Sequence, residues 1–431
     1  MSSPPENAPR PRSAWYVVTL LMLAYVSSFI DRQTLFLLVG PIRRDLGISD
    51  WQMSLLMGLS FALFYSVLGL PIGRLADRVS RRGIIGTGIA IWSLMTAACG
   101  LASTYGQLFL ARVGVGVGEA ALSPPAYSLL ADYFPRERLG TAIGVYSLGI
   151  YLGSGLSLML GGWLAGAGSW RSVFLWIGLP GLVIALLMRT IAEPRRGAMS
   201  AGPPPGTASM SAVWRYFRSH WRAYLGHHLG FALIAMVNYS WAAWVPSFLV
   251  RLHGWTTARV GFVYGLWTAT FGVAGVVLGG ILGDALRRRG WLDAKLRVGL
   301  IGVAGQVGAG LLFLLAPTEV MTWALIPSTF FASFGFGAAA AGVQEITPVP
   351  MRAQASALYL FFVSLVGLGA GPSFVAWFTD HVWHDDRAVG RAMVVVTLTG
   401  LSLAALALAS GLRGFREAAA GVERWQPERE S

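Results

Sequence analysis

Twelve apolar stretches, each of about 20 residues or more, follow one another along this chain. About 20 consecutive apolar residues in a helix cross the hydrocarbon core of a bilayer. Only helices and closed barrels can satisfy their backbone groups there. The stretches therefore predict an all-α membrane protein with 12 transmembrane helices. They lie near residues 14–38, 52–76, 83–103, 106–133, 138–164, 172–191, 222–250, 258–287, 296–316, 320–344, 353–379 and 389–413.

The composition supports a membrane protein. Of the 431 residues, 55% are hydrophobic and 12% are charged, whereas soluble domains carry roughly 25% charged residues. Cys99 is the single cysteine, which excludes an intrachain disulfide and a Cys-based metal site. The first apolar stretch is too long for the core of a cleaved signal peptide, so we expect it to remain as a helix.

The basic residues are unequally divided between the two ends of the predicted helices. On the side that carries both termini lie 24 of the 33 Lys and Arg residues, and 7 lie on the other side. Cytoplasmic loops hold such an excess. Both termini are therefore predicted to be cytoplasmic, and the net charge of +13 requires no nucleic acid as a partner.

The longest connection, residues 193–211, is rich in Pro, Gly and Ser and divides the helices into six plus six. Residues 212–222, which follow this segment, mix Trp and Phe with Arg, which predicts an amphipathic helix on the inner leaflet. The predicted domains are a disordered arm (1–13), an N-terminal bundle (14–191), a cytoplasmic linker (192–221), a C-terminal bundle (222–413) and a cytoplasmic tail (414–431).

Two segments of the halves echo one another. GRLADRVSRR (73–82) follows the second helix, and GILGDALRRR (280–289) follows the eighth, with the same Gly-to-Asp and Asp-to-Arg spacing. Asp132 and Pro135 after the fourth helix match Glu345 and Pro348 after the tenth. Such internal repeats are typical of secondary transporters, whose sites lie where the repeats meet near the bilayer midplane.

Four ionisable residues lie deep in the predicted helices: Asp31, Arg32, Arg112 and Glu119. A charge at a helix centre costs at least ~2.5–3.5 kcal/mol on insertion, so these residues are candidates for function. The helical rise of about 1.5 Å per residue gives them interleaving depths. We therefore predict a cluster of two acids and two arginines in the N-terminal half.

Two interpretations of the cluster remain open. In one, Asp31 pairs with Arg112 and Arg32 with Glu119, as buried ion pairs that hold the helices together. In the other, Asp31 and Glu119 carry protons, while Arg32 binds an anionic headgroup because guanidinium forks onto phosphate. Arg112 is counted with the substrate-binding residues and is also the expected structural partner of Asp31.

Aromatic and polar residues of the C-terminal half are the predicted opposite wall of the site. Aromatic rings in membrane helices also pack in the core or face lipid, and this alternative stays open. The predicted substrate-binding residues of this half are Asn238, Tyr239, Trp241, Trp244 and Tyr359.

With its six plus six helices and the motif G-x-L-x-D-R-x-x-R-R, the chain resembles the major facilitator superfamily. Within it, SFIDRQTL (28–35), GLPIGRLADRVSRR (69–82) and LARVGVGVGEAALSPPAYSLLADYFP (110–135) are most similar to the spinster family of lipid transporters. The resemblance implies a cytoplasmic latch at the motif. Its expected residues are Gly73, Asp77, Arg78, Arg81, Arg82 and, in the second copy, Asp284.

The resemblance also implies the function. We expect a secondary active transporter that works by alternating access, is coupled to protons and moves a lysophospholipid or sphingoid phosphate. The alternatives are a proton-coupled symporter of a small organic anion and a drug/proton antiporter. The expected partners are substrate, protons and membrane lipids; no cofactor is expected. We expect a monomer in a bacterial inner membrane.

The sequence does not favour an enzyme. None of the six histidines forms H-E-x-x-H, and the single lysine, Lys295, stands outside any G-x-x-x-x-G-K-[ST] motif. ATP-driven pumping is therefore excluded, and transport must draw on an ion gradient or on the gradient of the substrate itself.

Overall fold

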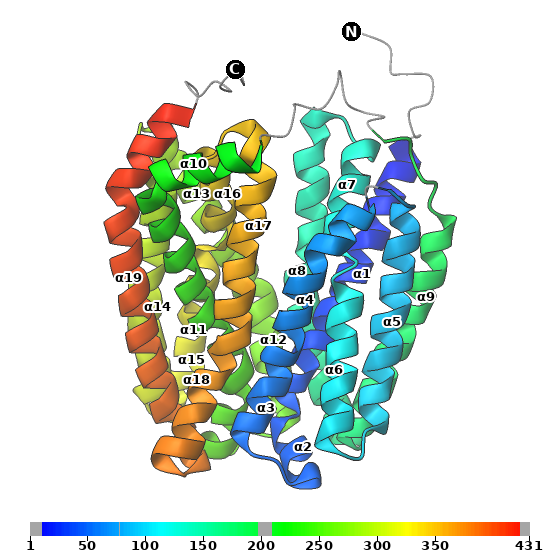
Figure 1. Cartoon of the computed structure of the whole chain (residues 1–431). Helices are drawn as coiled ribbons and strands as arrows, with labels where there is room; N and C mark the ends of the chain where they lie inside the picture. Colours follow the sequence, from blue (N-terminus) through cyan, green and yellow to red (C-terminus); the bar gives the residue numbers. More distant parts are fainter. Residues whose placement is uncertain (1–10, 77, 197–208, 423–431) are drawn as a thin grey trace. The chain divides into compact units, whose positions relative to one another are not determined.

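The computed structural model describes residues 11–76, 78–196 and 209–422. Every regular element in these ranges is helical and no strand occurs there, which confirms the predicted all-α class (Figure 1). Eleven helical segments of the described part are long and apolar enough to cross a membrane.

The α-helices are α1 (Pro11–Leu37), α2 (Val39–Leu46), α3 (Asp50–Met57), α4 (Leu59–Ala76), α5 (Arg81–Leu101), α6 (Tyr105–Glu119), α7 (Ser123–Tyr133), α8 (Arg136–Ala167), α9 (Trp170–Leu187), α10 (Met210–Ser219), α11 (Trp221–His253), α12 (Thr257–Trp267), α13 (Val273–Arg288), α14 (Ala294–Leu315), α15 (Thr318–Phe334), α16 (Phe336–Glu345), α17 (Arg352–Phe362), α18 (Gly371–Trp377) and α19 (Val389–Gly421). Shorter 3-10 or π-helical segments are η1 (Met188–Thr190), η2 (Thr268–Gly272), η3 (Val349–Met351), η4 (Val363–Ala370), η5 (Phe378–Trp383) and η6 (Asp386–Ala388).

The fourth predicted span, residues 106–133, is divided into two helices. α6 ends at Glu119 and α7 begins at Ser123, so neither half is long enough to count among the eleven. The physical reason is the Pro124-Pro125 pair in the first turn of α7. Proline lacks the N–H that would donate to the carbonyl four residues earlier in α6. Its ring also clashes with that carbonyl, so the helix cannot continue through the pair. The break places Glu119 at the end of a helix.

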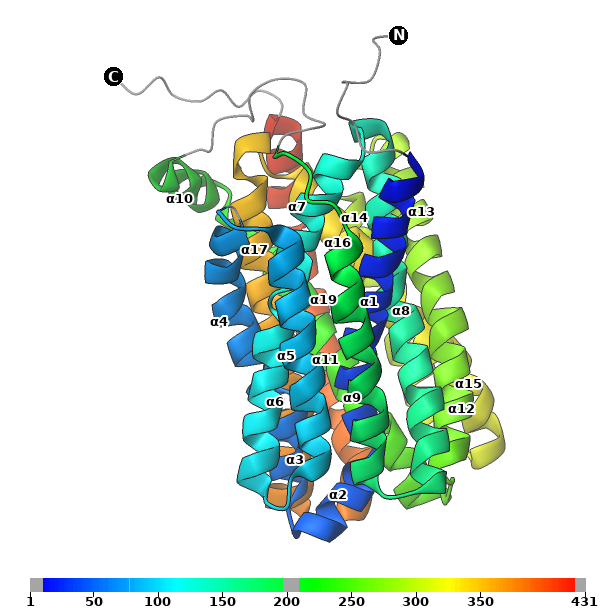
Figure 2. The same cartoon turned by 90° about the vertical axis from the view of Figure 1, so that its right-hand side faces the viewer.

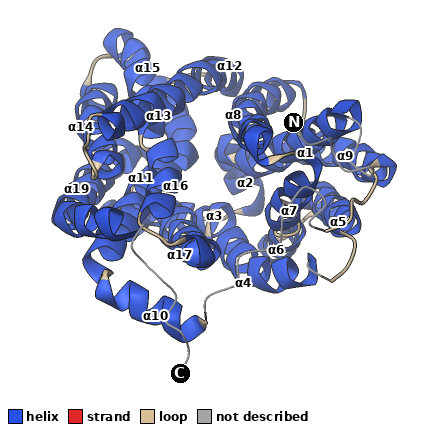
Figure 3. Ribbon diagram, turned by 90° about the horizontal axis from the view of Figure 1, so that it is seen from above, coloured by secondary structure: helices blue, strands red, loops and turns tan. Residues whose placement is uncertain are grey.

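The chain forms two compact units. Unit 1 comprises Met1–Pro204 with Gly254–Leu266, and unit 2 comprises Pro205–His253 with Trp267–Ser431. The change at residue 204 falls in the predicted linker. Residues 254–266, which the sequence assigns to the second bundle, group with unit 1. Each unit is a bundle of roughly parallel and antiparallel helices, viewed along their axes in Figure 3.

In unit 1, α1 packs along α8, and α5 packs along both α6 and α9. Figure 2 shows α9 beside α1 and α5. In unit 2, α11 packs along α19, and α14 packs along α15. The helices that carry the four deep charges, α1 and α6, therefore both belong to unit 1.

Two glycines allow close helix packing around these charges. A Cβ at Gly118 of α6 would lie 2.6 Å from the backbone nitrogen of Trp92 and 2.8 Å from the Gly88 carbonyl oxygen of α5. A Cβ at Gly153 of α8 would lie 2.7 Å from the Val26 carbonyl oxygen of α1. Small residues at such contacts let two membrane helices approach closely.

We predict that Gly118→Ala destabilises the protein by about 1–3 kcal/mol, because the new methyl group has backbone atoms in its way. Gly144→Ala in α8 is the matched control, since a Cβ there meets nothing within 4 Å. Thermal unfolding of the purified protein in detergent measures both. Equal melting temperatures for the two variants would contradict the proposed close contact.

Candidate functional site

Arg32 and Glu119 form a buried ion pair between α1 and the end of α6. The Arg32 Nη2 lies 2.5 Å from Glu119 Oε2, and their side chains are 8% and 1% exposed. The Ser28 hydroxyl donates to the same Glu119 oxygen at 2.6 Å. Ser28 lies one helical turn before Arg32, so both side chains lie on the face of α1 that meets α6.

Aromatic rings surround the guanidinium of Arg32. Its Cζ atom lies 4.2 Å from the ring centre of Phe61, 4.7 Å from Phe29 and 5.6 Å from Tyr65. A guanidinium within about 6 Å of a ring face gains electrostatic attraction from the ring quadrupole. Arg32 is thus held by one carboxylate and by aromatic faces of α1 and α4.

Asp31 and Arg112 lie close together but are not ion-paired side chain to side chain. Both residues are 0% exposed. Arg112 Nη1 donates to the backbone carbonyl of Asp31 at 3.3 Å, and neither carboxylate oxygen of Asp31 has a hydrogen-bond partner in the described part of the chain. Of the two predicted ion pairs, Arg32–Glu119 is present, whereas Arg112 contacts the backbone of Asp31.

A cluster of tyrosines in unit 1 was missed by the sequence reasoning. The rings of Tyr25 and Tyr146 stack at 4.6 Å, and Tyr127 meets Tyr146 edge-on at 5.5 Å. Ser123 Oγ lies 3.2 Å from the Tyr146 hydroxyl. Of these tyrosines only Tyr25 has a signal in the sequence, because its spacing from Ser28 and Arg32 puts the three residues on one face of α1.

In unit 2, three predicted wall residues use their polar atoms in packing. Asn238 Nδ2 donates to the Ala332 carbonyl at 2.7 Å. The Trp241 indole donates to Thr397 Oγ1 at 2.8 Å, and the Trp244 indole donates to the Pro372 carbonyl at 2.9 Å. Trp241 is 4% exposed and Trp244 is 0% exposed. These bonds indicate packing within the unit, so contact with substrate stays a prediction for these residues.

The other two wall residues differ in their surroundings. Tyr239 is half-buried, whereas the ring of Tyr359 meets His227 at 5.4 Å and His228 at 5.7 Å. The two histidines are buried, with their Nδ1 atoms 3.3 Å apart, and His227 Nε2 contacts the Ala339 carbonyl at 2.9 Å. The adjacent His-His in the sequence was the only signal for this pair.

At the predicted latch, Arg81 is the central residue. It is buried, pairs with Asp132, and donates from Nε to Glu193 Oε1 at 2.8 Å. The Arg82 backbone N–H donates to Glu193 Oε2 at 3.0 Å, and the Ser80 hydroxyl donates to the same oxygen at 2.9 Å. The sequence reasoning missed Glu193.

The other latch residues of the first copy contribute less to this network. Asp77 lies outside the described residues, Arg78 is exposed and Gly73 is half-buried. The Arg82 side chain donates to the Ile191 carbonyl at 2.5 Å. In the described part of the copy, Arg81 and Arg82 therefore carry the contacts, and the conformational role of the segment stays a prediction.

The second copy of the motif contains a similar network within unit 2. Lys295, which is 3% exposed, lies 2.6 Å from Asp284 and 3.7 Å from Glu345. Arg287 lies 3.9 Å from Glu345. Each unit therefore pairs an acid from its fourth span, Asp132 or Glu345, with a buried cation at the start of its third span, Arg81 or Lys295.

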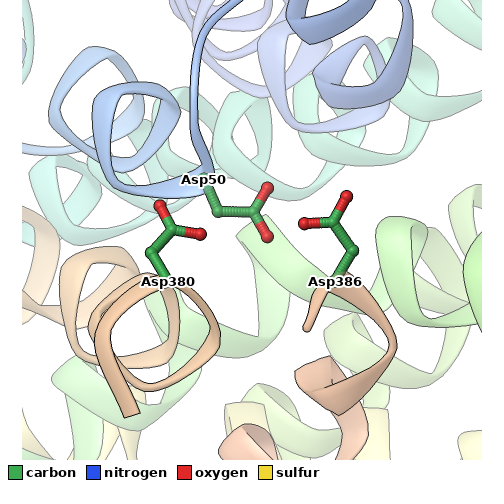
Figure 4. A group of neighbouring side chains, drawn as sticks. All are labelled: Asp50, Asp380 and Asp386. Atoms are coloured by element: carbon green, nitrogen blue, oxygen red, sulfur yellow. The ribbon is translucent and has the colours of Figure 1, made fainter. Parts of the chain in front are cut away.

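Three aspartates are labelled in Figure 4. Asp50 belongs to unit 1, where it pairs with Arg43 at 2.9 Å. Asp380 and Asp386 belong to unit 2, at η5 and η6. Calcium takes six to eight oxygen ligands, which two carboxylates of one unit do not provide, so we assign no metal to them.

The network around Arg81 shifts the pKa of Glu193. Partial burial raises this pKa, but the hydrogen bonds from Arg81, the Arg82 backbone and Ser80 lower it more, so that it lies below its usual value of 4.5. A lowered carboxyl pKa in the folded state stabilises the protein above the unfolded-state pKa. That stability is lost as pH falls through the lowered value.

We therefore predict that Glu193→Gln lowers the melting temperature by a constant amount between pH 6 and 8. Below about pH 4.5 the difference from the wild-type protein should shrink, because protonation of Glu193 breaks the same bonds. The control is Glu417→Gln, which removes an exposed pair with Arg413. A Glu193→Gln difference that stays constant down to pH 3.5 would contradict this assignment.

Comparison with known proteins now places the chain. The model of the Major Facilitator Superfamily matches residues 21–372. The chain belongs to the Major Facilitator Superfamily. It is therefore an integral membrane transporter and not an enzyme, as the sequence predicted.

The relatives of this transporter are named for different functions. It is 31% identical over 399 residues to an MFS-type efflux pump of Mycolicibacterium smegmatis, covering 90% of each chain. It is 27% identical over 386 residues to a probable galactarate/D-glucarate transporter of Bacillus subtilis, covering 82% of this chain and 83% of that one.

Among solved structures, the transporter is similar to a bacterial homologue of the human lysosomal transporter Spinster, in an inward-facing, unoccupied conformation. The TM-score is 0.79 and the identity is 26%, covering 97% of this chain and 100% of that one. This similarity confirms the resemblance to the spinster family that segments such as SFIDRQTL (28–35) indicate.

Proposed function

We propose that this transporter moves an amphiphilic substrate with an anionic or zwitterionic headgroup, of the lysophospholipid or sphingoid phosphate type, by proton-coupled alternating access. The observation that carries the proposal is the buried Arg32–Glu119 pair, in which one guanidinium is neutralised by one carboxylate. A phosphate headgroup and the Glu119 carboxylate are competing anions for Arg32.

Competition for Arg32 couples substrate to protons. When Glu119 takes up a proton, its carboxylate becomes a neutral acid and its attraction to Arg32 falls. Arg32 stays charged at physiological pH and can then fork onto a phosphate oxygen pair. Binding of one anion is thereby linked to uptake of one proton, and release of the anion restores the ion pair.

Asp31 is the second proposed proton carrier. A carboxylate that is buried without a hydrogen-bond donor is costly, and protonation removes that cost. Both Asp31 oxygens have this environment in the described part of the chain. Asp31 precedes Arg32 in the chain, and Arg112 donates to its backbone carbonyl, so we propose that the charge of Asp31 responds to the state of the Arg32–Glu119 pair.

The amphiphilic character of the substrate is supported by the rings around Arg32. Phe29, Phe61 and Tyr65 surround the guanidinium with apolar surface. Tyr25 on α1 and Tyr146 on the neighbouring α8 add hydroxyl groups. An anion anchor within apolar walls fits a polar headgroup with an attached hydrocarbon chain.

A small organic anion is the second candidate substrate, favoured by the similarity to the probable galactarate/D-glucarate transporter. Such a dianion would also compete with Glu119 for Arg32. The similarity to the efflux pump keeps a drug/proton antiporter as a third candidate. We propose further that the protein acts as a monomer in a bacterial inner membrane with cytoplasmic termini.

We predict that anionic substrate binds more tightly as pH falls, by up to about tenfold per pH unit, because one proton is taken up with it. In Glu119→Gln the affinity should be independent of pH, and Arg32→Gln should abolish binding. Isothermal titration at several pH values, with a lysophosphatidyl lipid and with galactarate as ligands, measures this and separates the two substrate classes.

The control for that experiment is Arg171→Gln, which removes a half-buried arginine paired with Asp45 in the same unit. It should bind like the wild-type protein. A pH-dependent affinity that persists in Glu119→Gln would contradict the competition, and Asp31→Asn would then be tested for the same proton. Binding of neither ligand class would contradict the substrate proposal.

We predict that, in proteoliposomes, a pH gradient accelerates flux of the labelled lysophospholipid. Asp31→Asn should reduce this acceleration, because Glu119 alone still carries a proton, and should leave flux without a gradient measurable, since the arginine anchor is intact. Acceleration that is unchanged in Asp31→Asn would exclude Asp31 as a proton carrier.

A further inference from the structure

α10 lies across the end of unit 2, whereas α11 runs along the bundle (Figure 1). Only His220 separates the end of α10 from α11. α11 is a candidate membrane span that begins at Trp221. A helix that lies across a bundle and is joined by one residue to the end of a membrane span must lie at the membrane depth of that end. For α10 that depth is the membrane–water interface.

One face of α10 is packed on unit 2. Val213 and Tyr216 are buried, and the Tyr216 hydroxyl donates to the Ile346 carbonyl at 3.0 Å. Tyr224 of α11 reaches the same turn, with its hydroxyl 2.8 Å from Thr347 Oγ1. Burial raises the pKa of Tyr216 to about 12, so the hydroxyl is protonated and can donate this hydrogen bond.

The opposite face is exposed and combines tryptophan with arginine. Trp214 is 68% exposed and Trp221 is 54% exposed. Arg215, Arg218 and Arg222 are exposed as well. Trp214, Arg215 and Arg218 stand at positions i, i+1 and i+4 on one face of α10, and Trp221 and Arg222 follow in the first turn of α11. Residues 209–222 include no acidic residue that would neutralise this face.

We propose that the exposed face of α10, together with the first turn of α11, binds the headgroups of anionic phospholipids in the leaflet on which it lies. Arginines near a membrane surface are attracted by anionic lipids, and guanidinium forks onto phosphate. Tryptophan belongs at the headgroup level, so Trp214 and Trp221 favour a lipid over a free phosphate ion.

Lipid binding at this face has a consequence for unit 2. Ile346 follows the last residue of α16, and η3 then leads into α17. Through the Tyr216 hydrogen bond, a lipid that holds α10 also holds the turn between α16 and α17. Anionic lipid should therefore stabilise unit 2 and not only bind to it.

The test uses the full-length protein in detergent, titrated with phosphatidylglycerol, with phosphatidylcholine and with inorganic phosphate. Native mass spectrometry measures the bound lipid, and thermal unfolding measures stabilisation. We expect phosphatidylglycerol to bind and to raise Tm, and phosphate to do neither. Replacing the three arginines (Arg215→Gln, Arg218→Gln, Arg222→Gln) should weaken phosphatidylglycerol binding at least about tenfold.

The matched control removes three other arginines of unit 2 (Arg288→Gln, Arg289→Gln, Arg413→Gln) and should change the affinity less than about twofold. If the α10 triple variant does not fold, the single variant Arg218→Gln should weaken binding about fivefold. Equal losses in the two triple variants, or the same Tm rise with inorganic phosphate, would overturn the proposed site.

The link to the α16–α17 turn has its own variant. Tyr216→Phe keeps the ring and removes the hydroxyl by which α10 donates to the Ile346 carbonyl, while the Tyr224 hydroxyl of α11 still donates to it. We expect it to bind phosphatidylglycerol like the wild-type protein but to gain less Tm from it. An undiminished Tm rise in Tyr216→Phe would show that lipid binding does not act through this turn.

Discussion

A charged side chain in the hydrocarbon layer has no water around it, so its counter-charge has to come from the protein. The Arg32–Glu119 pair is the centre of unit 1 for this reason. It requires α1 and α6 to lie in contact, and the Ser28 hydroxyl and the ring of Phe61 complete the surroundings of the two charges. Much of the local packing can be understood as the enclosure of this pair.

The same constraint explains why Asp31 differs from its neighbour. Adjacent residues of a helix point about 100° apart, so Asp31 cannot share the partners of Arg32. Arg112 contacts Asp31, but its guanidinium donates to the backbone carbonyl of Asp31 and not to the carboxylate. One buried acid is thus paired and the other is not, and this inequality gives the site two carboxyl groups of different character.

Near the membrane surface, the two units use one plan with different residues. Arg81 forks between Asp132 and Glu193, because guanidinium offers several donors in a plane. Lys295 of unit 2 is a single ammonium and lies between Asp284 and Glu345. The sequence repeat therefore corresponds to a repeated ion-pair network. The networks differ in one acid: Glu193, which follows the sixth span, belongs to the network of unit 1, whereas Asp284 belongs to the network described for unit 2.

Much of the fold could be predicted, since burial in lipid demands long apolar helices and each helix leaves a visible apolar run. Pro124 and Pro125 were visible too, yet a hydropathy count passed over the break that they cause in the fourth span. For the site, the sequence identified the deep charges but not Tyr146, because an aromatic residue in an apolar span has no periodic signal that distinguishes a site from packing. Trp241 and Trp244 illustrate the reverse case, in which prominent rings proved to be bonded within unit 2.

The sequence by itself determined the helical class, the repeat of six helices, the family and the presence of four charges at membrane depth. These follow from composition and spacing along one chain. Only the tertiary structure decided which charges are partners, that Glu193 joins Arg81, and that α10 exposes its arginines while Tyr216 holds it to unit 2. Such choices depend on distances between segments far apart in sequence, and a helical pattern gives the face of a residue but not the helix that this face meets.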